Sequence, residues 1–213
     1  LAVSQILRVA FLAFMFVVSH PGVVGTQSSA IVLVQHAATD AGATMSASLA
    51  FTASNTAGNF IAVAIRAGKS NEVFTVTDSN ANTYRQAVQL NVTVDTPLGD
   101  TLAIFYAENI KGGANTVTVT DSITGASLRF AILEYSGVAT TNALDGGVAA
   151  EGTSLSPSSG NLTTTANGDL LLGAIMSANS RTFTAGSGYV IQDGVPAAPN
   201  TKLITEDRIQ PTA

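Results

Sequence analysis

The pentapeptide TVTDS occurs twice in this chain, at Thr75–Ser79 and at Thr118–Ser122. In both copies apolar and hydroxyl residues alternate, and Asp and Ser follow. Alternation with a period of two is typical of a strand with one buried face, and Asp and Ser are typical of the turn after it. The sequences around the two copies do not otherwise repeat. We therefore interpret the pentapeptide as a strand end and not as a duplicated module.

The rest of the chain extends this pattern. Short runs rich in β-branched and aromatic residues alternate with clusters of Gly, Asn, Asp and Ser, and no long run has the period of a helix. The sequence therefore predicts an all-β protein, with strands at residues 31–36, 47–53, 59–67, 73–77, 83–90, 101–109, 115–120, 126–136, 161–165, 169–176, 181–185 and 201–209.

The predicted strands are of two kinds. FIAVAI (60–65) and LLLGAI (170–175) are apolar on both faces, as in strands covered from two sides, whereas TVTVT (116–120) alternates and predicts one wet face. A two-sheet antiparallel β-sandwich of the jelly-roll or Greek-key type accommodates both kinds better than an up-and-down barrel does. We expect IKGGANT (110–116) to form a tight Gly-Gly hairpin between two of these strands.

The first 30 residues have the features of an export signal. Arg8 precedes an apolar run, Val9–Val18, and small residues follow, with cleavage expected near Gly25 or Ala30. The run is about half the ~20 residues that span a bilayer, so no stable membrane span is expected. We predict a signal peptide at 1–30, a single sandwich domain at 31–213, and a secreted or cell-surface location. Because the chain stops directly after a predicted strand, we expect that the last strand of the sandwich is missing.

Composition argues against several classes of function. The 213 residues include only nine Lys and Arg and carry a net charge of −5, which leaves no basic stripe for nucleic acid. There is no Cys, and His36 is the one His outside the export segment, which argues against zinc chemistry. Neither an Asp/Glu-x-Asp pair nor a Gly-x-Ser-x-Gly elbow occurs. We therefore expect a protein that is not an enzyme.

Several stretches also resemble a known domain. VTDSNANTY (76–84), AIFYAENIKGGANTVTV (103–119), AILEYSGV (131–138), GDLLLGAI (168–175) and TEDRI (205–209) are similar to an uncharacterised β-sandwich domain that accompanies immunoglobulin-like repeats in exported bacterial proteins. The resemblance covers nearly all of residues 31–209. It implies a jelly-roll or lectin-like sandwich with an extracellular binding or architectural role. It implies no catalytic residues, and a further closing strand that this chain lacks.

One stretch is a candidate calcium site. Asp78, Asn80 and Asn82 place side-chain oxygens at alternating positions, as the start of an EF-hand loop does. However, Thr83 stands where that loop needs Gly, and Gln89 stands where it needs Glu. Turn formation is therefore the main interpretation, and no cofactor is expected. Calcium held with the help of distant ligands is the alternative.

Glu134 is the most conspicuous carboxylate. Period two places it on the same face as Phe130 and Ile132, and a carboxylate on an apolar face is costly unless it is paired. We expect it to bond a neighbouring loop, or an arginine such as Arg66 or Arg85. Ligand contact and catalysis are the alternatives.

Tyr84 and Tyr189 lie beside predicted turns, where their rings are candidates for sugar contact, although tyrosines also cap core edges. The main hypothesis is a non-catalytic extracellular binding or adhesion module of a larger secreted or cell-surface protein. Its expected partners are a polysaccharide or a cell-surface component, and other domains of the same protein. One alternative is a structural spacer or self-assembling unit whose sheet edges pair. A polysaccharide-active enzyme is the third hypothesis.

Overall fold

The computed structural model describes residues 17–18, 30–94 and 99–212. These residues form antiparallel strands and no helix, so the all-β prediction is confirmed. The strands are β1 (Val17–Val18), β2 (Val32–Ala43), β3 (Ser46–Ala50), β4 (Phe60–Ala67), β5 (Phe74–Asp78), β6 (Arg85–Val92), β7 (Asp100–Ala107), β8 (Thr116–Asp121), β9 (Ser127–Ser136), β10 (Leu144–Gly146), β11 (Asp169–Arg181), β12 (Val190–Val195) and β13 (Thr201–Gln210).

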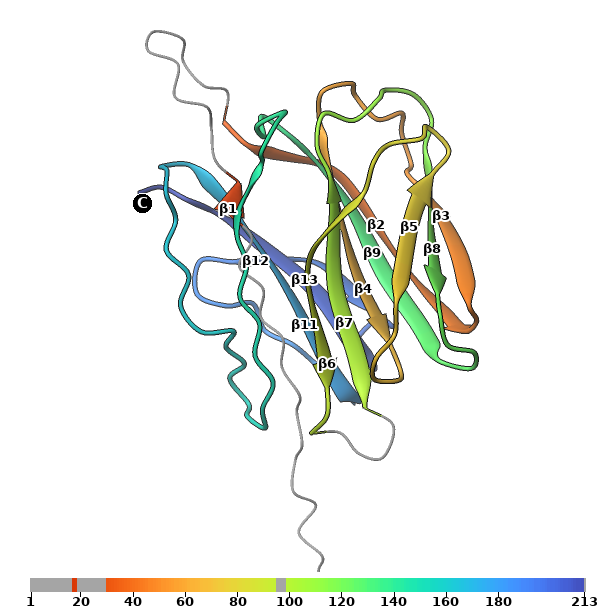
Figure 1. The fold of residues 1–213 in the computed structure, drawn as a ribbon. Coiled ribbons are helices and arrows are strands. Elements are labelled where there is room, and N and C mark those ends of the chain that lie inside the picture. Colours follow the sequence, from red (N-terminus) through yellow and green to blue (C-terminus); the bar gives the residue numbers. More distant parts are fainter. Residues whose placement is uncertain (1–16, 19–29, 95–98, 213) are drawn as a thin grey trace, which may run out of the picture.

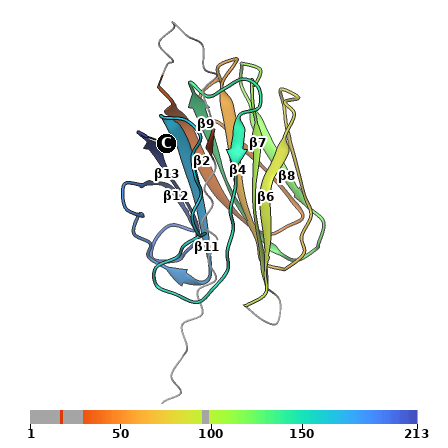
Figure 2. The same cartoon turned by 60° about the vertical axis from the view of Figure 1, so that its left-hand side comes forward.

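The strands form three sheets stacked as layers (Figure 1). Sheet A has the order β10-β1-β11-β13-β12, sheet B the order β2-β9-β4-β7-β6, and sheet C the order β3-β8-β5. The second view separates sheet A from the strands of sheet B (Figure 2). Among the described strands, β6–β7 and β12–β13 are the only neighbours in a sheet that also follow each other in the sequence. The antiparallel sandwich is thus confirmed, with a third sheet that the sequence did not predict.

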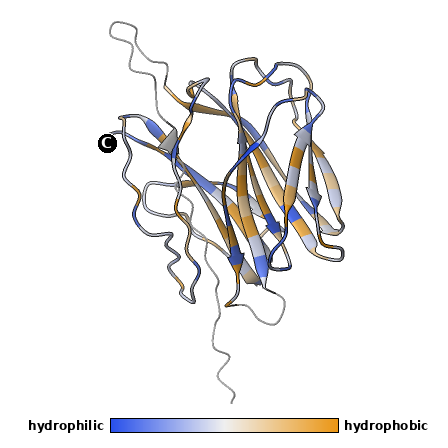
Figure 3. Ribbon diagram, in the orientation of Figure 1, coloured by the Kyte–Doolittle hydropathy of each residue, from blue (hydrophilic) through white to orange (hydrophobic). Residues whose placement is uncertain are grey.

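Sheet B lies between two apolar cores. Side chains from alternate positions of β4 enter opposite cores, with Phe60 and Ala62 facing sheet A, and Ile61 and Val63 facing sheet C. Every residue of β4 and β7 is buried, which explains why FIAVAI is apolar on both faces. Each large side chain buried in this way stabilises the fold by about 1.5–3 kcal/mol. Figure 3 shows the strands of sheet B as largely hydrophobic.

The two copies of TVTDS pair with each other in sheet C. Thr75 lies opposite Thr120, and Thr77 lies opposite Thr118, so that one copy runs antiparallel to the other. The intervening valines of both strands are buried against sheet B. In each copy the Asp carboxylate accepts a hydrogen bond from the backbone N–H two residues further along the chain, and the distance is 3.1 Å in both turns. The interpretation as a strand end followed by an Asp turn is confirmed.

Some strand predictions are wrong. Residues 161–165 and 182–185 are not strands, whereas β10 and β12, which both contain Asp and Gly, were not predicted. IKGGANT does not close a hairpin, because it leads from β7 in sheet B to β8 in sheet C. Gly113, which has a φ of 113°, forms a bridge with Asn55 instead.

The predicted export segment lies outside the described residues, apart from β1, which pairs with β10 and β11. In the part of the chain that the structure describes, no helix has the length and apolar character needed to cross a membrane.

Candidate functional site

Asp78 is the hub of the turn that follows β5. Its carboxylate accepts hydrogen bonds from the backbone N–H groups of Asn80 (3.1 Å) and Asn82 (3.0 Å). It also accepts side-chain hydrogen bonds from Asn82 (2.7 Å), Asn115 (2.9 Å) and the Tyr84 hydroxyl (2.9 Å). Burial alone would raise the pKa of Asp78, but these donors outweigh it and hold the pKa below its usual value. The turn is therefore built on an ionised carboxylate.

The three candidate calcium ligands act as turn residues in this arrangement. Both oxygens of Asp78 accept hydrogen bonds from the protein, and the side-chain oxygen of Asn82 accepts one from the Lys111 N–H at 2.8 Å. The described residues contain no group of three or more acidic, His or Cys side chains that could hold a metal ion. Donors supplied by the protein thus occupy the side-chain oxygens of Asp78 and Asn82 that a cation would need.

Beside this turn lies an open hollow of about 400 Å³, which we call the end hollow. Three connections meet there, from β5 to β6, from β7 to β8 and from β9 to β10. Its volume is within the range of about 300–1,000 Å³ that is typical of small-ligand sites. Almost all of its lining residues are polar: Ala81, Asn82, Thr83, Arg85, Glu108, Asn109, Lys111, Thr140 and Thr141.

Charged groups of the end hollow are held in place by the protein. Arg85 donates to Glu108 at 2.6 Å, and the other oxygen of Glu108 accepts a hydrogen bond from the backbone N–H of Ala143 at 2.8 Å. Hydrogen bonds to Tyr106 and Glu108 raise the pKa of Arg85, so its guanidinium stays charged. Lys111 donates its ammonium to the backbone carbonyl of Ala81 at 3.0 Å. The hollow thus offers cationic donors, a carboxylate and hydroxyls in one place.

Strained backbone surrounds the same hollow. Ala81, Asn109 and Asn142 have φ values of 53°, 52° and 51°, in the left-handed region that favours glycine. This conformation costs about 1–2 kcal/mol for a residue such as Ala, which has no side-chain hydrogen bond to offset it. Ala81 is held there because its N–H donates to the Asp78 carbonyl and its own carbonyl receives Lys111. Such strain persists where the surroundings enforce it, and it clusters at binding sites.

Glu134 bonds a loop and not an arginine. The buried carboxylate accepts hydrogen bonds from the side chains of Gln35, Asn55 and Asn59, each at 2.7 Å, and from the backbone N–H of Thr56 at 2.9 Å. Four donors replace the hydration that the carboxylate loses on burial. Glu134 therefore anchors the connection between β3 and β4 to sheet B.

The two arginines considered as partners of Glu134 pair with other carboxylates. Arg66 lies 2.5 Å from Asp100, and Arg85 bonds Glu108 in the end hollow. The hydrogen-bond donors to Glu134 are therefore all neutral groups.

Tyr189 and Tyr84 are not open aromatic platforms. The guanidinium of Arg208 lies 5.2 Å from the centroid of the Tyr189 ring and covers one face of it. Tyr84 packs its ring against the core between sheets B and C and donates its hydroxyl to Asp78. Burial and the Asp78 charge both raise the pKa of Tyr84. Tyr84, Tyr189 and Glu134 lie in three separate environments, so they do not form one site.

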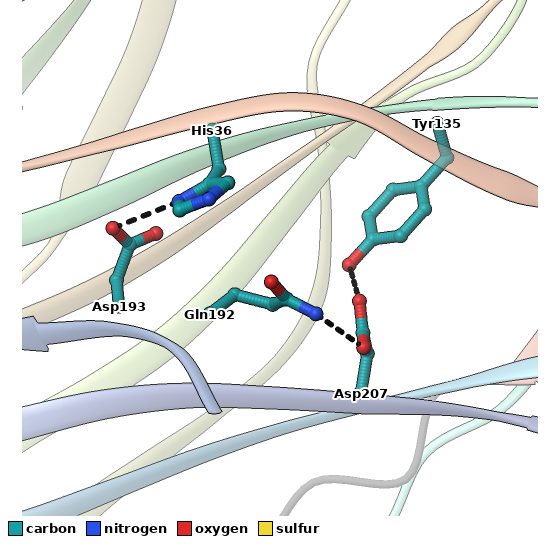
Figure 4. A network of polar contacts seen from close by, with 5 residues as sticks. All are labelled: His36, Tyr135, Gln192, Asp193 and Asp207. Atoms are coloured by element: carbon teal, nitrogen blue, oxygen red, sulfur yellow. Dashed lines mark hydrogen bonds and ion pairs between the residues drawn. The ribbon is translucent and has the colours of Figure 1, made fainter. Parts of the chain in front are cut away.

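Sequence reasoning missed a polar network that ties sheet A to sheet B (Figure 4). The buried hydroxyl of Tyr135 in β9 donates to Asp207 in β13 at 2.5 Å, and Gln192 in β12 donates to the other oxygen at 2.8 Å. Nearby, His36 in β2 lies 3.1 Å from Asp193 in β12. Burial raises the pKa of Asp193 above its usual value, although the hydrogen bond and charge of His36 offset part of this shift. The network could not be predicted without β12, and it acts as a brace between the two sheets.

A buried pair of acidic side chains lies at one end of sheet C. Glu72 and Asp121 are 0% and 1% exposed. Burial, together with the nearby charge of Asp121, raises the pKa of Glu72 to about 8, although the charge of Lys69 and the Ile123 N–H oppose this shift. Glu72 therefore keeps its proton at neutral pH.

The lining residues contributed by the connections after β7 and β9 were also missed, because loop residues far apart in sequence carry no periodic signal. The only available signal was the pair of Asn residues, Asn109 and Asn142, because Asn tolerates the left-handed conformation.

Comparisons with known proteins found no matching family model, no matching curated protein and no matching solved structure. The functional argument therefore depends on the geometry described above.

Proposed function

We propose that this protein is a non-catalytic binding module for saccharides and that the end hollow is its binding site. The observation that carries the proposal is a polar hollow whose groups are fixed before any ligand arrives. Its charges are paired or bonded to backbone, and strained Ala81 and Asn109 form part of its wall. A site held in this way loses little conformational entropy on binding.

The chemistry of the lining residues matches that of sugars. A sugar hydroxyl both donates and accepts, so it needs donors and acceptors side by side. Arg85 and Lys111 supply donors, Glu108 supplies an acceptor, and the exposed hydroxyls of Thr140 and Thr141 supply both. Binding without catalysis is proposed because Glu108 is the only carboxylate among these lining residues, whereas glycoside hydrolysis needs two.

We also propose that the module is exported. The apolar run and the small residues after it support this proposal. Expression with the complete N-terminus and sequencing of the secreted product tests it. A product that stays inside the cell with an intact N-terminus would argue against export.

The saccharide proposal is tested by a glycan array, followed by calorimetry with the best binder. Replacing Thr140 and Thr141 together with Val removes two hydroxyls and keeps the side-chain shape, so affinity is expected to fall at least about tenfold. Thr153→Val is the matched control, because Thr153 is exposed on another loop. Silence across neutral and acidic glycans, or a double variant that binds as well as the control, would refute the assignment.

A further inference from the structure

The face of sheet A that points away from sheet B carries a small apolar cluster. Ile175 in β11 and Ile204 in β13 point to this face, because their neighbours in the sequence, Met176 and Leu203, enter the core between sheets A and B. Ile175 and Ile204 are nevertheless buried, and Phe183 packs against them. Chain segments outside the sheet therefore cover part of its outer face.

A pocket with a cavity volume of about 170 Å³ opens over this cluster, and we call it the outer pocket. Its apolar wall comes from two parts of the chain. Leu155 and Pro157 belong to the connection between β10 and β11, while Ile175 and Phe183 belong to β11 and the segment that follows it. A cavity of about 150 Å³ lined by Leu, Ile and Phe can hold benzene, so the outer pocket has room for a ring of that size.

The one charge on the wall of the outer pocket is positive. Arg181, the last residue of β11, is the only charged residue among those that line it. Arg66, Arg85 and Arg129 each lie against a carboxylate, whereas Arg181 forms no ion pair with any residue that the structure describes. Its hydrogen bond to the Ser180 carbonyl is long, at 3.4 Å, and its Nε is buried without a partner. Its guanidinium is thus available to an anion, and carboxylates match its geometry.

The wall of the outer pocket after β11 is fixed at both ends. At one end, Arg181 pairs with Thr201 in β13. At the other end, the N–H of Gly186 donates to the carboxylate of Glu206 at 2.9 Å. A side chain at Gly186 would approach Tyr189 to 3.2 Å, so the chain is tightly packed at this point. The pocket is therefore formed before a ligand arrives, which lowers the entropy cost of binding.

We propose that the outer pocket binds a small carboxylic acid whose apolar part is about the size of a benzene ring. The ring lies among Leu155, Ile175 and Phe183, and the carboxylate pairs with Arg181. Leu155 is 80% exposed in the unliganded chain, and the ligand covers it. The outer pocket shares no lining residue with the end hollow, so this proposal is independent of saccharide binding.

Fluorine NMR of para-fluorobenzoate mixed with the full-length chain at neutral pH tests the proposal. Wild type is expected to broaden the fluorine signal with a Kd of about 1 mM or tighter. Para-fluorobenzyl alcohol has the same ring without the charge and is expected to bind at least about tenfold more weakly, as is para-fluorobenzoate to Arg181→Gln. Lys69→Gln is the control, because it removes one positive charge from the connection after β4, and it is expected to behave as wild type.

Leu155→Ser repeats the test in case Arg181→Gln fails to fold, which circular dichroism checks. Because Leu155 is exposed, the change is compatible with folding, and affinity for para-fluorobenzoate is expected to fall at least about threefold. Val73→Ser, at an exposed valine before β5, is its control. Wild type that leaves the fluorine signal unchanged overturns the proposal, and so does binding that survives both pocket variants. Equal affinity for the benzoate and the alcohol overturns it in favour of a purely apolar pocket.

Discussion

Replacing Glu72 with Gln is expected to change how the free energy of unfolding depends on pH. Glu72 is buried beside Asp121, and its pKa is raised to about 8 by burial first and by that neighbour second. A raised pKa means that the folded state keeps a proton that the unfolded state releases near its ordinary value of 4.5. The stabilisation is complete below that value and is lost as pH rises through about 8.

The size of the effect follows from one proton. Between about pH 5 and about pH 8 the folded state binds one proton more, so the free energy of unfolding falls by up to about 1.4 kcal/mol per pH unit. Over this window the Glu72 contribution reaches roughly 4 kcal/mol as an upper limit. The amide introduced by Glu72→Gln resembles the protonated acid and can donate to Asp121, so the variant loses this dependence.

Urea unfolding followed by circular dichroism at several pH values between about 5 and about 8 measures the effect. The difference between the variant and wild type is the quantity of interest, because groups such as Asp193 and Glu206 titrate in both proteins and cancel. The free energy of unfolding of the variant, relative to that of wild type, is expected to increase steadily as pH rises. Glu151→Gln, which alters a carboxylate bonded to Thr93, is the control and is expected to run parallel to wild type. A variant curve that stays parallel to wild type across the window would refute the reasoning.

Three further changes test other parts of the fold. Glu134→Leu is expected to lower the free energy of unfolding in urea by about 3–5 kcal/mol, because it leaves four inward-facing donors without an acceptor; a loss below about 1 kcal/mol would contradict the anchoring role. Tyr135→Phe is expected to cost about 1–3 kcal/mol in the same measurement, because buried Asp207 loses a donor; no change would show that the brace is not stabilising. Ala81→Gly is expected to raise the melting temperature, because it relieves a left-handed alanine by about 1 kcal/mol, and a lower melting temperature would argue against strain there.

Much of the fold could be predicted from the sequence, because buried positions in a strand recur with a regular period. The inner strands β4 and β7 of sheet B are buried on two faces and appear as largely apolar runs, while β8 of sheet C alternates strictly. Both patterns follow from local chain geometry, so they can be recognised without knowing which strand pairs with which. For the same reason, the sequence could not distinguish a two-sheet sandwich from three sheets, since an apolar run does not say what covers it.

The end hollow could not be predicted, because its residues come from three connections that meet only after the sheets have formed. Glu108 follows β7 and Thr140 follows β9, and neither position carries a pattern that differs from an ordinary turn. For Glu134 the sequence left two partners open, a neighbouring loop or an arginine. The fold supplies Asn side chains and one backbone N–H of the loop, because a loop that crosses a strand end presents many neutral donors at once.

The two TVTDS copies show how far a short motif determines its own chemistry. Both supply an alternating strand and an Asp turn, and these features are local. The electrostatic surroundings of the two aspartates differ, because they depend on the residues that follow each copy in the sequence and on the side chains that pack against it. Asp78 is followed by SNANTY and receives hydrogen-bond donors, which hold it ionised as the hub of the turn beside the end hollow. Asp121 is followed by a Gly turn and faces another carboxyl, Glu72, so that corner of the protein keeps a proton. One pentapeptide therefore builds a single sheet and ends in two different electrostatic environments.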